Sequence, residues 1–260
     1  MQIFLVNLDR HPARLKRMLE LLKGASFKRI AAVDGRTIEG LETRDPARPM
    51  SRDNLSRYEK ACILSHRKAW LEFLAGSDDR CCILEDDVFI GPDFFRFMND
   101  ESWIPQDGDL VKIETFRNRI FVSRKEIHCL NRSAAQLLSL HFGTGAYILS
   151  RGMAEVLLEE TCDPQRTLDR ILFDETAIAR RSPIYQLLPA LCIQGQNLEN
   201  GILFQEMQSA IKPKRLKKNK TVFERITIEV ARPLRHLKYF VWAKARERQM
   251  QARHCIVPFK

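Results

Sequence analysis

The stretch RCCILEDDVFIGPDF, residues 80–94, joins a short apolar run to three consecutive acids, Glu85, Asp86 and Asp87. The apolar run predicts a buried strand at about residues 80–84. Three adjacent carboxylates repel one another and suit a strand interior poorly, so they mark the end of that strand. The acids indicate either a solvated acidic turn or a site for a divalent cation, and the cluster alone leaves both interpretations open.

The segments around this stretch predict alternating strands and helices. Further strands are predicted at residues 2–6, 27–35, 108–116, 118–123 (paired with the next segment of the chain), 143–150 and 183–194. Helices are predicted at 11–24, 57–75, 151–161 and 168–181, the second beginning with a capping box, Ser56 and Glu59. This order predicts an α/β fold, a Rossmann-type, mostly parallel sheet flanked by helices. Ligands of such sheets bind at the carboxyl ends of the strands, where the acids lie.

The positive charge is concentrated near the C-terminus. Residues 212–260 contain 15 Lys and Arg against 3 Asp and Glu, a charge of +12, whereas residues 1–211 carry −2. We therefore expect a catalytic domain at 1–211 and a basic helical extension at 212–260. Apolar residues with helical spacing run along this extension: Phe223, Ile226, Val230, Leu234, Leu237 and Val241. Such a helix either binds an anionic membrane surface or packs on the domain.

Several classes of protein are disfavoured by composition. Seven cysteines without a CxxC pair argue against a disulfide framework and a zinc site. A run of eighteen apolar residues and a signal-peptide pattern are both missing, so we expect a cytoplasmic protein. The tail would also suit nucleic acid, but the body lacks a basic excess and the tail lacks an RRM, KH or zinc pattern, so no nucleic-acid partner is expected.

Six short stretches carry a family resemblance. They are VNLDRHPAR (6–14), AAVDG (31–35), YEKACILSHRKAW (58–70), CILEDDVFIGPDF (82–94), GTGAYILSR (143–151) and TLDR (167–170). In this order they resemble the family 25 glycosyltransferases of bacterial lipopolysaccharide and lipooligosaccharide biosynthesis, several of which are β-1,4-galactosyltransferases. The resemblance covers about residues 2–200. It implies a GT-A-like fold, a nucleotide-sugar donor and a divalent metal bound by a DxD-like motif.

The implied activity is inverting transfer of a hexose, galactose first, from a UDP-sugar to a lipid-linked lipopolysaccharide or lipooligosaccharide acceptor. Mn²⁺ or Mg²⁺ would assist the departing diphosphate. The basic tail would hold the enzyme at the inner face of the bacterial inner membrane. Two alternatives remain: a protein that binds nucleic acid or membrane through its tail, and a family member that binds sugars without catalysis.

The resemblance also assigns residues to the donor side. Asp87 and Glu85 are the metal-ligand candidates, with Glu where a DxD motif begins. The nucleotide would contact residues near the ends of the first two strands and the acidic motif: Asn7, Asp9, Arg14, Asp34, Gly35, Glu85 and Asp86. Simpler interpretations compete, because Asp9 could cap the first helix and Asp34–Gly35 is ordinary turn chemistry.

Inverting transfer also needs a base for the acceptor hydroxyl. The candidates are Glu114 and Asp169, with Asp174 less favoured. Glu114 is an acid inside an apolar strand, which would raise its pKa unless Lys112 pairs with it. Asp169 could instead be a helix N-terminal acid. Substrate-binding candidates are Glu59, Ser65, His66, Gly143, Thr144 and Gly145, although the capping box explains Glu59 without any chemistry.

Overall fold

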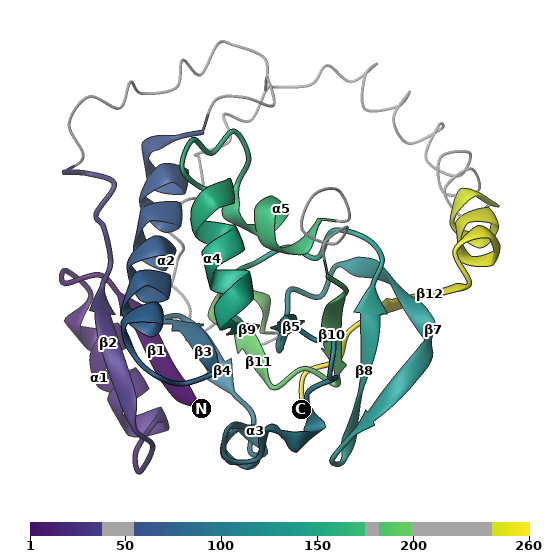
Figure 1. Cartoon of the computed structure of the whole chain (residues 1–260), viewed down its shortest axis with the longest axis horizontal. Coiled ribbons are helices and arrows are strands. Elements are labelled where there is room, and N and C mark those ends of the chain that lie inside the picture. The colour runs from purple at the N-terminus through teal and green to yellow at the C-terminus, as the bar shows by residue number, and fades with distance from the viewer. Residues whose placement is uncertain (38–54, 175–181, 199–240) are drawn as a thin grey trace, which may run out of the picture.

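The computed structural model describes residues 1–37, 55–174, 182–198 and 241–260 (Figure 1). The helices are α1 (Pro12–Leu21), α2 (Arg57–Ala75), α3 (Phe94–Asn99), α4 (Arg151–Glu160) and α5 (Leu168–Phe173), and residues 241–249 are also helical. The strands are β1 (Gln2–Asn7), β2 (Phe27–Ala31), β3 (Arg80–Glu85), β4 (Val88–Ile90), β5 (Leu110–Lys112), β6 (Glu114–Thr115), β7 (Arg119–Cys129), β8 (Arg132–Leu137), β9 (Ala146–Ser150), β10 (Ile184–Leu188), β11 (Cys192–Gln194) and β12 (Ala252–Ile256). The predicted strand–helix–strand opening is therefore confirmed.

The main sheet is mixed, so the prediction of a mostly parallel sheet was wrong. Its strand order is β12-β7-β8-β10-β5-β9-β3-β1-β2. Among these described strands, only β1–β2, β1–β3 and β5–β10 pair in parallel. Strand β9 runs antiparallel between β3 and β5, and β7 and β8 form a hairpin across a tight turn. Strands β7 and β8 are joined by a short connection, whereas β9 pairs with strands that lie far from it in the chain, and a sequence pattern of apolar runs does not show the direction of such pairings.

The sheet has an apolar core on each face. Helices α2, α4 and α5 pack on one face, against Phe4, Ile83 and Tyr147, and Figure 1 shows these helices side by side. Helices α1 and α3 pack on the other face, against Ile3 and Leu84. Successive strand residues alternate between the faces. The helices therefore cover the sheet and leave its carboxyl edge to form the site.

Three parallel strands bring polar residues to that edge. In the register of β1 with its neighbours, Asn7 lies beside Ala31 and Val6 beside Glu85. Helix α2 begins next to this edge with the predicted capping box: Glu59 N donates to Ser56 Oγ (3.3 Å), and Ser56 N donates to Glu59 Oε2 (2.7 Å). The capping box fixes where α2 starts, and hence which α2 residues face the edge.

The predicted strand at 108–116 divides between two sheets. Its first part, β5, joins the main sheet, and its second part, β6, joins a small sheet of order β4-β11-β6. Strand β4 follows Asp87 directly and β6 contains Glu114, so this small sheet supports both acids.

The C-terminal residues take part in the fold. Strand β12 pairs antiparallel with β7 at the edge of the main sheet. Beyond it, Val257 is buried and its carbonyl accepts a hydrogen bond from Thr115 Oγ1 (2.8 Å). The expectation of a purely helical extension is therefore corrected at 252–260. The division at residue 211 and the apolar residues 223–237 lie outside the described residues, and Val241 is exposed.

Candidate active site

A cleft opens at the carboxyl ends of β1, β2 and β3, beside the first turns of α1 and α2. Seven of the predicted site residues line it: Arg14, Gly35, Ser65, His66, Glu85, Asp86 and Asp87. Residues that the sequence did not single out also line it, including Arg10, His11, Tyr58 and Cys62. The cleft thus has an acidic floor from the end of β3 and a basic wall from the start of α1.

Asp86 lines the cleft and connects three elements around it. Its Oδ2 accepts from Asn7 Nδ2 (2.7 Å), its Oδ1 pairs with Arg14 Nη1 (3.0 Å), and its carbonyl accepts from Arg17 Nη2 (2.8 Å). These contacts join the end of β3 to the end of β1 and to α1. Asn7 is itself buried beneath them. Both residues therefore shape the cleft through this clamp.

Asp87 is buried, and its Oδ1 has no hydrogen-bond partner among the residues that the structure describes. Burial, with the neighbouring carboxylates of Glu85 and Asp86, raises the pKa of Asp87 well above its usual range. A buried carboxylate oxygen without a partner is costly unless a cation or proton meets it. The site therefore fits a hard divalent cation held by Asp87 and Glu85.

Glu85 is held by two donors. Thr144 Oγ1 donates to its Oε1 (2.5 Å), and His66 Nε2 lies 3.3 Å from the same oxygen. Burial alone would raise the pKa of Glu85, but the contacts with His66 and Thr144 lower it, so the carboxylate is charged. Cys62, one turn before His66 on α2, completes a group of three potential metal ligands whose ligating atoms lie within 4.8 Å of one another.

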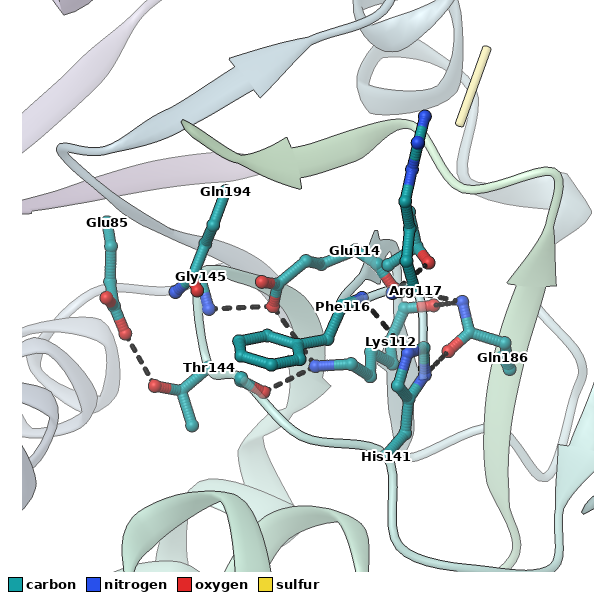
Figure 2. A network of polar contacts seen from close by, with 12 residues as sticks. Glu85, Lys112, Glu114, Phe116, Arg117, His141, Thr144, Gly145, Gln186 and Gln194 are labelled. Carbon is teal, nitrogen blue, oxygen red and sulfur yellow. Dashed lines mark hydrogen bonds and ion pairs between the residues drawn. The ribbon is translucent and has the colours of Figure 1, made fainter. Parts of the chain in front are cut away.

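Glu114 and Lys112 form a fully buried ion pair (Figure 2). Lys112 Nζ lies 3.1 Å from Glu114 Oε2 and also donates to the carbonyl of Gly143. Gly145 N donates to the same Glu114 oxygen (2.8 Å). Burial raises the pKa of Glu114 and lowers that of Lys112. The predicted alternative, pairing with Lys112, is therefore what the structure shows, and Glu114 is not among the cleft-lining residues.

A neutral histidine extends this network. Burial lowers the pKa of His141 to about 3, so the ring is uncharged. Its Nε2 accepts from Phe116 N (3.1 Å), so its Nδ1 carries the proton and donates to Gln186 Oε1 (2.6 Å). Gln186 in turn donates to the carbonyls of Lys112 and Glu114. The loop at residues 143–145 is thus held by a buried polar network, through the Gly143 carbonyl and Gly145 N; Figure 2 shows Thr144 and Gly145 beside it.

Further predicted residues are held by ion pairs and hydrogen bonds. Asp9 is mostly exposed and pairs with Arg29, and Asp34 pairs with Arg10. Ser65 Oγ accepts from Val33 N (2.8 Å), which ties the end of β2 to α2. Asp169 is half-buried near the start of α5 and accepts from Thr167 Oγ1 (2.5 Å), while Asp174 pairs with Arg170 (3.7 Å).

Some of the missed residues carried a sequence signal. Arg10 and His11 stand between Asp9 and Arg14, within a stretch that already pointed to the cleft. Cys62 stands four residues before His66, so both face the same side of the helix. Tyr58 is the first residue of the matched stretch at 58–70. It reaches the cleft because Gly35 has no side chain, since a Cβ there would lie 2.8 Å from Tyr58 Cδ1.

Comparison with known proteins identifies the family. Residues 1–172 match the family described as "Glycosyltransferase family 25 (LPS biosynthesis protein)". The chain belongs to glycosyltransferase family 25. The predicted resemblance is therefore confirmed.

Two relatives illustrate the extent of the similarity. The chain is 32% identical over 150 residues to the lacto-N-neotetraose biosynthesis glycosyltransferase LgtE of Neisseria meningitidis serogroup B, covering 54% of each chain. It is 27% identical over 217 residues to the lipooligosaccharide biosynthesis protein lex-1 of Haemophilus influenzae, covering 78% of this chain and 72% of the relative. The chain thus spans about half the length of the first relative.

Among solved structures, the chain is similar to a glycosyltransferase involved in glycosylation of the major capsid of PBCV-1. The TM-score is 0.40 at 10% identity, covering 74% of this chain and 92% of the other. A similarity of this size carries no argument about the fold, so the GT-A-like description remains a prediction. Within the described residues, none of the helices is both long and apolar enough to span a membrane.

Proposed function

We propose that this chain is a metal-dependent, inverting glycosyltransferase that moves a hexose from a UDP-sugar to a lipooligosaccharide acceptor. Family membership supports the reaction class. The observation that carries the proposal is the buried Asp87 carboxylate on the floor of the cleft, whose Oδ1 meets no hydrogen-bond partner in the described part of the chain. Galactose is the donor sugar we would test first, because the family resemblance implies it.

The cleft offers complementary groups to a nucleoside diphosphate. Asp87 and Glu85 would hold the divalent cation, which neutralises the charge of the leaving diphosphate when bound. Arg10 and Arg14 supply positive charge on the opposite wall, next to the N-terminus of α1, where backbone N–H groups favour an anion. Tyr58 offers an aromatic surface.

Asp169 is the better candidate for the base. Glu114 is fully buried, and its Oε2 is engaged by Lys112 and Gly145, so an acceptor hydroxyl would have to displace the 143–145 loop to reach it. Asp169 is only half-buried. Burial and the Glu85 charge are the main causes that raise the pKa of the Cys62 thiol in the cleft, and the charge of Asp169 adds to them, so Asp169 lies near the cleft. The Asp169 carboxylate would take the proton of the acceptor hydroxyl as this hydroxyl attacks the donor sugar.

The test is a titration of UDP with and without Mn²⁺. We compare the wild-type protein with Asp87→Asn and with Asp163→Asn, which changes an exposed acid between α4 and α5. Binding that requires both Mn²⁺ and Asp87, and that Asp163→Asn leaves intact, supports the proposal and justifies a transfer assay with UDP-galactose, UDP-glucose and UDP-N-acetylhexosamines. Metal-independent binding, or none, would overturn it.

A further inference from the structure

A buried hydrogen-bonded chain leads from the core to Glu85. Trp70 Nε1 donates to Tyr147 Oη (3.0 Å), Tyr147 Oη lies 2.7 Å from His66 Nδ1, and His66 Nε2 lies 3.3 Å from Glu85 Oε1. Trp70, Tyr147 and His66 are each at most 1% exposed. This series of hydrogen bonds connects three elements, because Trp70 and His66 lie on α2, Tyr147 lies on β9 and Glu85 lies at the end of β3.

Counting donors and acceptors fixes the protons in this chain. The phenol oxygen of Tyr147 already accepts the Trp70 N–H, and its own proton needs an acceptor in a fully buried setting. Among its described partners, only His66 Nδ1 can accept that proton. A hydrogen on His66 Nδ1 would instead aim two donors at one oxygen and leave the phenol proton unsatisfied. His66 must therefore carry its proton on Nε2 and donate it to Glu85.

The Nε2–H tautomer limits what the three potential metal ligands can bind. A histidine that binds a metal through Nε2 needs a lone pair on that nitrogen. In the Nε2–H tautomer it has none, so Cys62, His66 and Glu85 do not form a ready metal site. Both donors, His66 and Thr144, instead engage Oε1 of Glu85, which leaves Oε2 as the oxygen available to a ligand in the cleft.

We propose that Tyr147 and His66 are positioning residues that, with Thr144, orient the Glu85 carboxylate toward the donor nucleotide and its cation. This inference rests on the proposed function. Hydrogen bonds behind a ligating group fix its orientation and strongly affect metal affinity. Tyr147 is completely buried and does not line the cleft, so it would act on Glu85 only through His66.

The first test reads the tautomer directly and needs no ligand. Long-range ¹⁵N–¹H correlation spectra of protein labelled with ¹⁵N-histidine resolve Nδ1 from Nε2, and the His66→Gln variant assigns the His66 signals. We expect a neutral ring with the proton on Nε2 in the wild-type protein and a changed Nδ1 shift in Tyr147→Phe. A proton on Nδ1 in the wild-type protein, or an unchanged spectrum in Tyr147→Phe, would overturn the inference.

The second test measures UDP binding in the presence of Mn²⁺. Loss of an outer-shell hydrogen bond predicts an affinity about ten- to a hundredfold lower for Tyr147→Phe. Tyr185→Phe is the matched control, because it also removes a phenol hydrogen bond from a buried tyrosine, to Asp107 Oδ1 (3.0 Å), away from the cleft. His66→Gln, which keeps an N–H donor, should bind more tightly than His66→Ala. Equal affinities for the two tyrosine variants would refute a positioning role.

The two tests keep the two proposals apart. If the wild-type protein binds no UDP in either condition, the proposed function fails, while the spectra still decide whether His66 donates to Glu85. If UDP and Mn²⁺ bind as expected but Tyr147→Phe binds like Tyr185→Phe, the function stands and the positioning role fails. Both tyrosine variants are first checked for a native circular dichroism spectrum.

Discussion

The buried pair of Lys112 and Glu114 should be the electrostatic support on which the stability of the site depends. Both side chains are 0% exposed, and 3.1 Å separates the ammonium from the carboxylate. The Lys112 ammonium also lies 4.1 Å from the centre of the Phe173 ring. Replacing Lys112 with Met keeps an unbranched side chain of similar length. Among the described residues, it leaves the buried Glu114 carboxylate with only the Gly145 N–H as a partner.

Breaking one side of a buried ion pair costs about 3–5 kcal/mol in the free energy of unfolding. For a protein of this size, each kcal/mol shifts the melting temperature by about 2–4 °C, so Lys112→Met should melt about 10 °C lower. Adding Glu114→Gln removes the stranded charge and should restore most of the loss. The carbonyl of Gly143 also loses its donor, so the 143–145 loop and its Thr144–Glu85 contact should loosen.

Urea and thermal unfolding followed by circular dichroism measure these effects. The control is Lys28→Met, which breaks the ion pair with Glu72, where the two side chains are 54% and 40% exposed. Exposed pairs contribute at most about 1 kcal/mol. The buried pair is not the support proposed if Lys112→Met costs no more than Lys28→Met, or if the double variant is no more stable than Lys112→Met.

Three further outcomes are expected at the site. Since the folded-state pKa of Asp87 is raised, its negative charge destabilises the folded protein as pH rises above the ordinary carboxyl range. In EDTA, Asp87→Asn should therefore have a higher melting temperature than wild type at pH 7, and the difference should shrink toward pH 4. The folded-state pKa of His141, about 3, lies below its ordinary value of 6.5, so unfolding takes up a proton at pH values between the two. Over this range the free energy of unfolding of the wild type, measured with urea, should fall by about 1.4 kcal/mol for each unit of decreasing pH, relative to His141→Gln. Gly143 has φ +85°, and a Cβ there would lie 2.8 Å from Glu114 Oε1, so Gly143→Ala should lower the free energy of unfolding by at least about 1–2 kcal/mol. Gly152→Ala, with open space around the added methyl, should stabilise α4 by about 0.5 kcal/mol. Equal melting temperatures for the two variants would contradict this.

The sequence alone determined the local elements and the position of the acids. Apolar runs and the Ser56–Glu59 capping box predicted β1, β3 and α2, because these signals act within a few residues. The change from an apolar run to three adjacent acids predicted that the carboxylates stand at the end of a strand, and β3 ends at Glu85.

The tertiary structure alone decided how these elements pair and which charges are satisfied. The antiparallel insertion of β9 and the return of β12 to the sheet join residues far apart in the chain, and local propensity carries no information about such pairings. The same holds for the site, where Glu114 proved to be paired and Asp87 Oδ1 to be without a partner within residues 1–37, 55–174, 182–198 and 241–260. Burial and neighbouring groups decide whether a carboxylate stabilises or destabilises the fold. For Glu85 these neighbours are in place only after Trp70, Tyr147 and His66 have packed behind it.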